Sequence, residues 1–157
     1  MKQQPIKRSA QLKTLSRDHH IGLLFAWKIK EGLSKNVAPQ RLKNYVNFFF
    51  ENHLKIHFRD EEVLLFNRID DNVCIQAKKE HQQLLRQLVN INNASPDNQD
   101  VYLELVKILN EHIRFEERVV FPRLEEILPI STLNLVNDFL GKDEHRLGDD
   151  YSDEFWK

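Results

Sequence analysis

Four long stretches of this chain carry apolar residues at intervals of three and four positions, which is the spacing of one face of a helix. The stretches cover roughly residues 9–35, 39–69, 72–93 and 96–128, and short polar breaks separate them. The chain has only 4 Gly and 5 Pro, so signals for the many turns of a sheet of short strands are scarce. We therefore predict an all-α protein, an up-down-up-down four-helix bundle.

The breaks between the stretches also suggest where the helices begin and end. Pro39 suits the first turn of the second helix, and residues 70–72 form a polar break before the third. Ser95 is a candidate N-cap of the fourth helix, with Pro96 as its first residue. Pro122 lacks a backbone N–H, so we expect a bend or an end of the fourth helix just after Glu116.

The end of the chain differs in composition from the four stretches. A short extra C-terminal helix is expected between Pro129 and Gly141. We assign residues 1–141 to the bundle and residues 142–157 to a polar, acidic C-terminal segment, which is a tail or a docking segment and carries Tyr151, Phe155 and Trp156 near its end.

Length and charge narrow the class of protein. A chain of 157 residues suits one domain with a single core. Lys and Arg number 23 against 24 Asp and Glu, so no basic field favours nucleic acid or a membrane surface as a partner. The longest apolar run, residues 21–27, is too short to span a bilayer, and the N-terminal residues lack the apolar stretch of a secretory signal. A cytoplasmic protein is expected.

Two decapeptides 55 residues apart repeat one pattern. HFRDEEVLLF spans residues 57–66 and HIRFEERVVF spans residues 112–121. In each copy a histidine and the first glutamate, His57 with Glu61 and His112 with Glu116, stand one helical turn apart and project from the same face. The second glutamate and the arginine of each copy (Glu62, Arg59, Glu117 and Arg114) should point toward the solvent or the rim, where they could pair with each other.

These histidines and glutamates lie on faces that should be buried. His81 occupies the same kind of position on the third helix. A carboxylate in a bundle core costs several kcal/mol unless its charge is compensated, and no Lys or Arg on these faces offers compensation. A metal ion would supply the missing positive charge.

The first helix adds one more histidine, and two candidates stand side by side. His19 falls at the centre of the apolar face by helical phase. His20 aligns better with the local sequence around His81, since in both places a Leu-Leu pair begins three residues after the histidine. Both stay candidates at this stage.

One histidine from each of four helices and one glutamate from each of two can hold two metal ions. The two glutamates would bridge the ions, and the histidines would be terminal ligands. Carboxylate oxygens with imidazole nitrogens suit iron or manganese, and zinc is a further candidate. Cys74 is the single cysteine, which excludes a cysteine-based zinc site and an intrachain disulfide.

The order H…HxxxE…H…HxxxE, with the local strings LSRDHH, HFRDEE and HIRFEERVVFP, resembles the bacterial hemerythrin-like, or HHE cation-binding, family over about residues 12–128. The resemblance implies a four-helix bundle with two iron ions that binds or senses dioxygen or nitric oxide. It implies as ligands the residues His19 or His20, His57, Glu61, His81, His112 and Glu116.

Two positions depart from the oxygen-carrying hemerythrins of that resemblance. Leu85 stands where those proteins have a second histidine on the third helix, and His112-x-x-x-Glu116 stands where they have HxxxxD. Both departures favour sensing or redox chemistry over simple oxygen carriage. The alternative functions are therefore a redox enzyme that reduces peroxide or nitric oxide with a redox partner protein, and a protein of iron homeostasis.

The remaining notable side chains have simpler expected roles. His53, one turn before His57, should be a core or supporting residue rather than a seventh ligand. Cys74 should be a small buried apolar residue. Phe48, Phe49, Phe50 and Trp27 are expected in the core.

Overall fold

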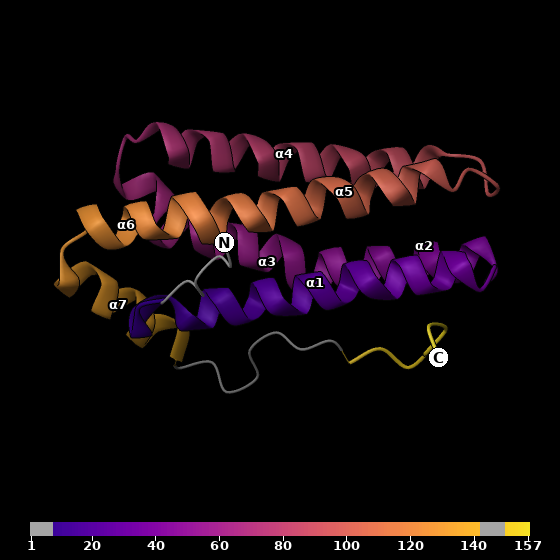
Figure 1. Ribbon diagram of the computed structural model, residues 1–157, viewed down its shortest axis with the longest axis horizontal. Coiled ribbons are helices and arrows are strands. Elements are labelled where there is room, and N and C mark those ends of the chain that lie inside the picture. Colours follow the sequence, from indigo (N-terminus) through magenta and orange to yellow (C-terminus); the bar gives the residue numbers. More distant parts are fainter. Residues whose placement is uncertain (1–7, 142–149) are drawn as a thin grey trace, which may run out of the picture.

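The structure is a computed structural model that describes residues 8–141 and 150–157. Four long helical rods lie side by side, and consecutive rods run in opposite directions (Figure 1). The first rod is η1 (Ala10–Leu12) with α1 (Lys13–Ser34); the second is α2 (Pro39–Phe49), η2 (Phe50–Leu54) and α3 (Lys55–Leu64); the third is α4 (Asn72–Asn93); the fourth is α5 (Asp100–Phe115), η4 (Glu116–Val120) and α6 (Phe121–Ile127).

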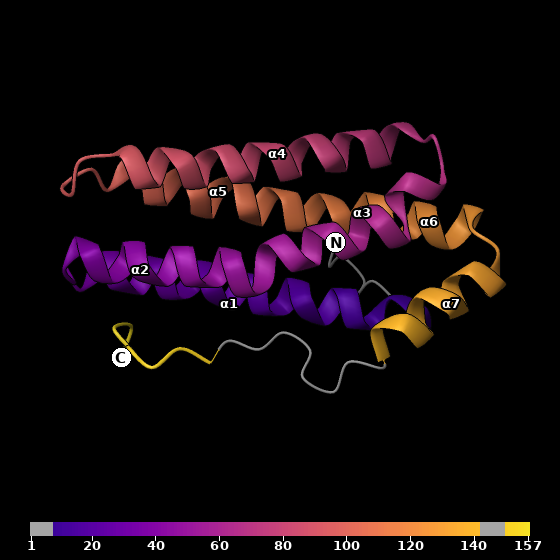
Figure 2. The same ribbon diagram turned by 180° about the vertical axis from the view of Figure 1, so that it is seen from behind.

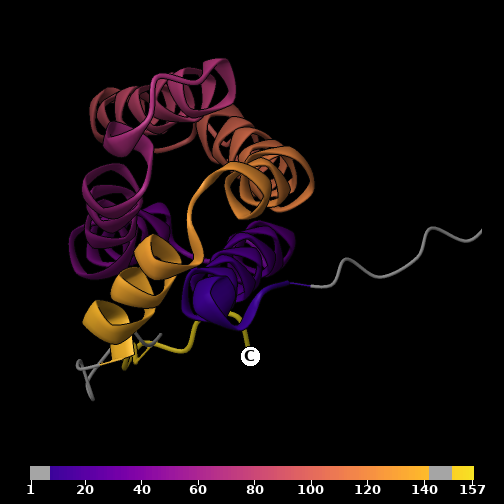
Figure 3. The same cartoon turned by 90° about the vertical axis from the view of Figure 1, so that its left-hand side faces the viewer.

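Two shorter elements complete the described fold. The single turn η3 (Phe66–Arg68) leads from the second rod to the third, and α7 (Ile130–Gly141) follows the fourth. Viewed end-on, the four rods surround a common core and α7 lies across one end of the bundle (Figure 3). No strand occurs in the described residues. The predicted all-α bundle with an extra C-terminal helix is confirmed.

Local sequence explains the ends of α1, α2 and α4. After α1, Asn36 adopts a positive φ of 54°, and the N–H groups of Asn36 and Val37 bond back to the last turn of the helix. This is a Schellman ending, in which Asn tolerates the left-handed conformation better than most residues. Pro39 opens α2 as expected, and the Asp71 carboxylate caps α4 by accepting the N–H of Val73.

The predicted start of the fourth helix was wrong by four residues. The helix α5 begins at Asp100, not at Pro96. Ser95 instead bonds through its hydroxyl to the carboxylate of Asp97, and the Asn98 side chain accepts the N–H of Asp100. Asn98 rather than Ser95 therefore supplies the side-chain oxygen for the first N–H of the helix.

Two π-turns interrupt the second and fourth rods. In η4 the N–H of Phe121 bonds to the carbonyl of Glu116, five residues back, directly before Pro122. The extra residue in that turn changes the helical phase. Val119, which simple periodicity places on the buried face, is therefore 42% exposed, and Val120 is buried in its place. We predicted a bend or an end of the helix just after Glu116; the structure has this π-turn there, and the rod continues into α6. The second rod has its π-turn at η2, ahead of its histidine motif rather than after it.

The core consists of two apolar clusters with a polar layer between them. One cluster gathers residues such as Phe25, Tyr45 and Phe49 near the α1–α2 end, and the other gathers Leu12, Phe66 and Phe121 near α7. The histidines and glutamates of the repeated motif lie between these clusters along each rod.

Cys74 and two of the aromatic residues predicted for the core are buried, but Trp27 is not. Cys74 lies buried in the second cluster, and burial raises the pKa of its thiol to about 11, so it is a small core residue as predicted. Phe49 and Phe50 are buried and Phe48 is half-buried. Trp27 was predicted to be a core residue, which was wrong. It is 49% exposed because it lies about 100° round the helix from the buried Ala26.

The predicted division at residues 141 and 142 stays a prediction. Residues 142–149 of the expected tail lie outside the described residues. Residues 150–157 lie along the first and second rods (Figure 2), and Phe155 is buried in the first apolar cluster.

Candidate metal centre

Six side chains from the four rods meet in the polar layer. His19 comes from α1, His57 and Glu61 from α3, His81 from α4, and His112 with Glu116 from the fourth rod. None is more than 4% exposed. The structure thus brings together every candidate ligand from the sequence except His20, which lies on the exposed side of α1.

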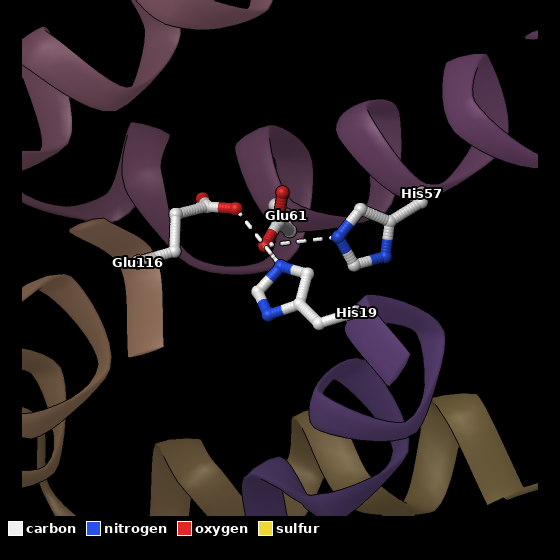
Figure 4. A group of neighbouring side chains, drawn as sticks. All are labelled: His19, His57, Glu61 and Glu116. Atoms are coloured by element: carbon white, nitrogen blue, oxygen red, sulfur yellow. Dashed lines mark hydrogen bonds and ion pairs between the residues drawn. The ribbon is translucent and has the colours of Figure 1, made fainter. Parts of the chain in front are cut away.

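The side chains form two groups of four that share both glutamates. One group is His19, His57, Glu61 and Glu116, drawn in Figure 4, and the other is Glu61, His81, His112 and Glu116. Within each group one donor atom of every residue lies within 4.8 Å of the others. Two neighbouring sites with two shared carboxylates are the arrangement expected for a pair of bridged ions.

The distances place Nε2 of each histidine against a glutamate oxygen. Nε2 of His57 lies 3.2 Å from Glu61, and Nε2 of His112 lies 2.9 Å from Glu116, each across one turn of the helix. Nε2 of His19 lies 3.0 Å from Glu116, and Nε2 of His81 lies 3.1 Å from Glu61.

Several of these buried atoms lie 2.9 to 3.2 Å from an oppositely charged partner but make no well-directed hydrogen bond within the described structure. They include Nε2 of His57, His81 and His112 and both carboxylate oxygens of Glu61. Buried polar atoms are almost always satisfied, so six converging nitrogen and oxygen donors with this many unsatisfied atoms fit a metal site. The donor set has no sulfur and suits iron, manganese or zinc.

A close approach of α1 to α5 helps to form the layer. A Cβ atom built on Gly22 would lie 3.1 Å from Cδ1 of Ile113, so glycine lets the two helices come together one turn after His19.

Aromatic rings cover two of the histidines. Phe58 stacks on His81 with ring centroids 4.1 Å apart, and Phe121 stacks on His19 at 5.2 Å.

A second carboxylate holds the far nitrogen, Nδ1, of each of the four candidate ligand histidines. Asp18 accepts from His57 at 2.9 Å and Glu62 accepts from His81 at 2.7 Å. Glu80 accepts from His112 at 2.7 Å and Glu117 accepts from His19 at 3.1 Å. Such bonds fix the ring so that Nε2 points at the metal, and they make the imidazole a stronger donor.

These four bonds link the rods in a closed cycle. The first rod holds the second through Asp18, the second holds the third through Glu62, the third holds the fourth through Glu80, and the fourth holds the first through Glu117. Each carboxylate is next in sequence to a candidate ligand, yet the histidine it holds is on another rod.

Glu62 and Glu117 lie at the rim, one of the two predicted places, but their partners differ from the predicted arginines. Their side chains are 27% and 24% exposed and bond to His81 and His19. Glu117 also pairs with Arg8 at 2.9 Å, whereas the exposed Arg59 lies 3.8 Å from its own neighbour Asp60. A signal was present in the sequence, because an acidic residue adjoins His19, His81, Glu61 and Glu116 in turn.

His53 is buried one turn before His57, which agrees with a core or supporting role. Its ring stacks on Phe49 at 4.6 Å and lies nearly parallel to His57 at 6.3 Å. Neither His53 nor the half-buried Leu85 belongs to either group of four.

Burial and the neighbouring carboxylates have opposite effects on the pKa values of the four histidines. Burial lowers the pKa of His57, but the charge of Glu61 and the bond to Asp18 outweigh it and raise the pKa to about 9. The pKa values of His19, His81 and His112 are also raised, because bonds and charges from glutamates outweigh burial. Burial and the charge of Glu116 raise the pKa of Glu61, but the histidines overcome both and lower it to about 2. All of these shifts favour positively charged histidines beside negatively charged glutamates when no metal is bound.

The carboxylates behind the histidines give a direct prediction. In Glu62→Gln and Glu117→Gln the amide can still accept a hydrogen bond, but it lacks the charge that strengthens the imidazole donor. We expect metal affinity to fall by roughly 10- to 100-fold in each variant. The measurement is competition for metal with a chelator of known affinity. Glu104→Gln changes the same charge at an exposed position of α5 and should leave the affinity unchanged; an equal loss there would contradict the role given to Glu62 and Glu117.

The comparisons with known proteins agree with this geometry. The family model described as the hemerythrin HHE cation binding domain matches residues 10–124, which include all six candidate ligands. No curated protein and no solved structure gave a match. Among the described residues, none of the helices is both long and apolar enough to span a bilayer. A family model that covers most of the chain, over a buried His and Glu centre of the right composition, shows that the chain belongs to the hemerythrin HHE cation-binding family and is a metal-cation-binding helical bundle.

Proposed function

We propose that the protein holds two iron ions in the polar layer and binds or senses a small ligand, dioxygen or nitric oxide, at this pair. His19 and His57 would hold one ion, His81 and His112 the other, and Glu61 with Glu116 would bridge them. The observation that carries the proposal is the sharing of both glutamates by the two groups of four.

The donor count supports an open position for a ligand. Two imidazoles and one oxygen from each bridging glutamate give each ion four protein donors, fewer than an octahedral ion takes. The remaining positions suit a small molecule rather than a large one, because Phe58 and Phe121 stack on the surrounding histidines. The bound iron would supply the chemistry of ligand binding and electron exchange.

The protein side chains have three tasks in this proposal. The Nε2 atoms and the two glutamates position the ions, the carboxylates Asp18, Glu62, Glu80 and Glu117 orient the imidazoles, and the aromatic rings limit the access of water. The histidines must also lose their protons before they bind metal, so loading the centre should release protons.

Iron loading followed by gas exposure tests the proposal. Protein purified without oxygen should contain two irons per chain, and its visible spectrum should change reversibly and with saturation on adding dioxygen or nitric oxide. Glu61→Gln should lose the response, and Glu104→Gln should keep it. One zinc per chain, or iron-loaded protein that shows no spectral change, would refute the proposal.

The same experiment separates binding from catalysis. The alternative function is a redox enzyme that uses this centre to reduce peroxide or nitric oxide. With an added electron donor, such an enzyme would consume either substrate continuously. A binding or sensing protein would take up nitric oxide only to the amount of its centres.

A further inference from the structure

The last eight residues form an ordered contact with the bundle, far from the metal centre in sequence and separate from it in structure. Residues 150–157 run along the outer side of the first and second rods (Figures 1 and 2). Phe155 is 3% exposed, and the rings of Tyr151, Phe155 and Trp156 lie 5.0, 5.2 and 5.7 Å from the ring of Tyr45. The segment therefore closes the first apolar cluster from outside.

Basic side chains of the first two rods hold the segment at three points. Arg41 makes a two-pronged contact with Asp153, with Nη2 at 2.6 Å and Nε at 2.9 Å from the two carboxylate oxygens. Nζ of Lys35 donates to the main-chain carbonyl of Trp156 at 2.7 Å, and Nζ of Lys28 lies 4.0 Å from the centre of the Trp156 ring. Charge and hydrogen bonding thus fix the register of the segment on the surface.

Gly32 provides the space for Phe155. A Cβ atom built there would lie 2.7 Å from both Cε2 of Phe155 and Cδ2 of Leu42. Gly32 lies inside α1 without a positive φ, so the glycine is needed for space and not for its backbone freedom. The surface therefore has a notch shaped for one aromatic ring.

Among the described residues, no hydrogen bond joins the main chain of the segment to the main chain of the bundle. Its described main-chain hydrogen bonds, from Phe155 to Asp153 and from Lys157 to Glu154, lie within the segment, and it extends no helix of the bundle. Such a contact can be exchanged without unfolding a helix. Tyr45 is fully buried with the segment in place, so an empty site would expose apolar surface, and replacement by a similar segment is favoured over vacancy.

We propose that the surface formed by Lys28, Gly32, Lys35, Arg41 and Leu42 is a peptide-recognition site for segments of the pattern Asp-x-Phe-Trp. Residues 150–157 are its intramolecular ligand, and a partner protein that presents the same pattern displaces them. Arg41 reads the acidic residue, the notch at Gly32 takes the Phe ring, and Lys28 with Lys35 holds the Trp.

Binding of a peptide in trans tests the site in the full chain. The host is Phe155→Ala/Trp156→Ala, whose own segment keeps Tyr151 but has lost the rings of Phe155 and Trp156. The probe is a fluorescent peptide with the sequence of residues 150–157. Anisotropy should show saturable binding to this host. Replacing Phe with Ala in the peptide should weaken binding by roughly 10- to 100-fold. The wild-type chain should bind at least about tenfold more weakly than the host, because its tethered segment competes at a high effective concentration.

An Arg41→Gln exchange added to the host should weaken binding several-fold, and Arg86→Gln, an exposed change on α4, should not. A host that keeps its helical circular dichroism and its metal content but does not bind the peptide would overturn the proposal.

A second variant tests the notch without touching the segment. In a Trp27→Phe background, Trp156 is the only tryptophan of the chain. The added methyl group of Gly32→Ala should expel Phe155 and shift the Trp156 emission to longer wavelength. Gly141→Ala, where a Cβ would meet nothing within 4 Å, should leave the emission unchanged. An unshifted emission in Gly32→Ala would refute the notch as the recognition element.

Discussion

Glu116→Ala is expected to abolish binding at both metal positions, whereas His57→Ala should abolish binding at one. Glu116 belongs to both groups of four, so its removal takes a donor and a negative charge from each position at once. His57 belongs to one group, so the group around His81 and His112 keeps its four donors. We expect the affinity of each position to fall by at least about 100-fold in Glu116→Ala, more than the loss of an outer carboxylate causes.

Metal analysis by mass spectrometry gives the stoichiometry of each variant, and circular dichroism checks that the helices persist. Glu104→Ala serves as the matched control, since it removes the same charge from an exposed position on α5. Retention of one full equivalent of metal by Glu116→Ala would show that the two positions do not share this carboxylate.

The metal-free protein is expected to lose stability as the pH rises from 7 to above 9. The pKa of His57 is raised from 6.5 to about 9 in the folded state, so its protonated form is favoured by folding. A raised histidine pKa contributes its full stability below the ordinary pKa and loses it as the pH passes the folded value. For a shift of this size the contribution of one group is at most roughly 3 kcal/mol, and the other three histidines shift in the same direction.

The lowered pKa of Glu61 determines how the stability of the metal-free protein changes at acid pH. Its pKa is lowered to about 2, so its contribution is present above its ordinary pKa of 4.5 and is lost as the pH falls toward 2. The free energy of unfolding of the metal-free protein, measured with urea, should therefore peak between the ordinary pKa values of glutamate and histidine.

The metal-loaded protein provides the control for this profile. Metal replaces the histidine protons, so its stability should not fall between pH 7 and 9, and metal affinity should rise with pH over that range. A metal-free protein whose free energy of unfolding is unchanged between pH 7 and 9.5 would show that the histidines are not protonated in the folded layer.

The sequence determined the fold and the composition of the centre because both depend on local periodicity. A helix repeats every 3.6 residues, so apolar faces and the histidines within them can be assigned from spacing alone. His57 with Glu61 and His112 with Glu116 each share one helix, and their one-turn spacing is a property of the chain rather than of the tertiary fold. The choice between His19 and His20 needed the structure, although helical phase already favoured His19.

Other features depended on elements far apart in sequence. Glu62 and Glu117 follow candidate ligands, but the histidines that they hold lie on other rods, so helical phase on their own rod placed them at the rim. The π-turn at η4 exchanged Val119 for Val120 in the core, because one extra residue in a turn shifts every later position. The spacing of apolar residues in the sequence does not reveal such a shift.

The docking of the C-terminal segment is the clearest case of a contact that the sequence does not predict. Residues 150–157 combine charged residues with the aromatic residues Tyr151, Phe155 and Trp156, and no periodicity shows where these rings pack. The structure nevertheless places Phe155 in the space left by Gly32, more than a hundred residues earlier in the chain. The sequence by itself determined which residues form the helices and which unusual side chains lie on their buried faces, because these follow from the helical repeat. Only the tertiary structure decided which carboxylate holds which histidine and where the chain end docks, because those contacts arise from the packing of one rod against another.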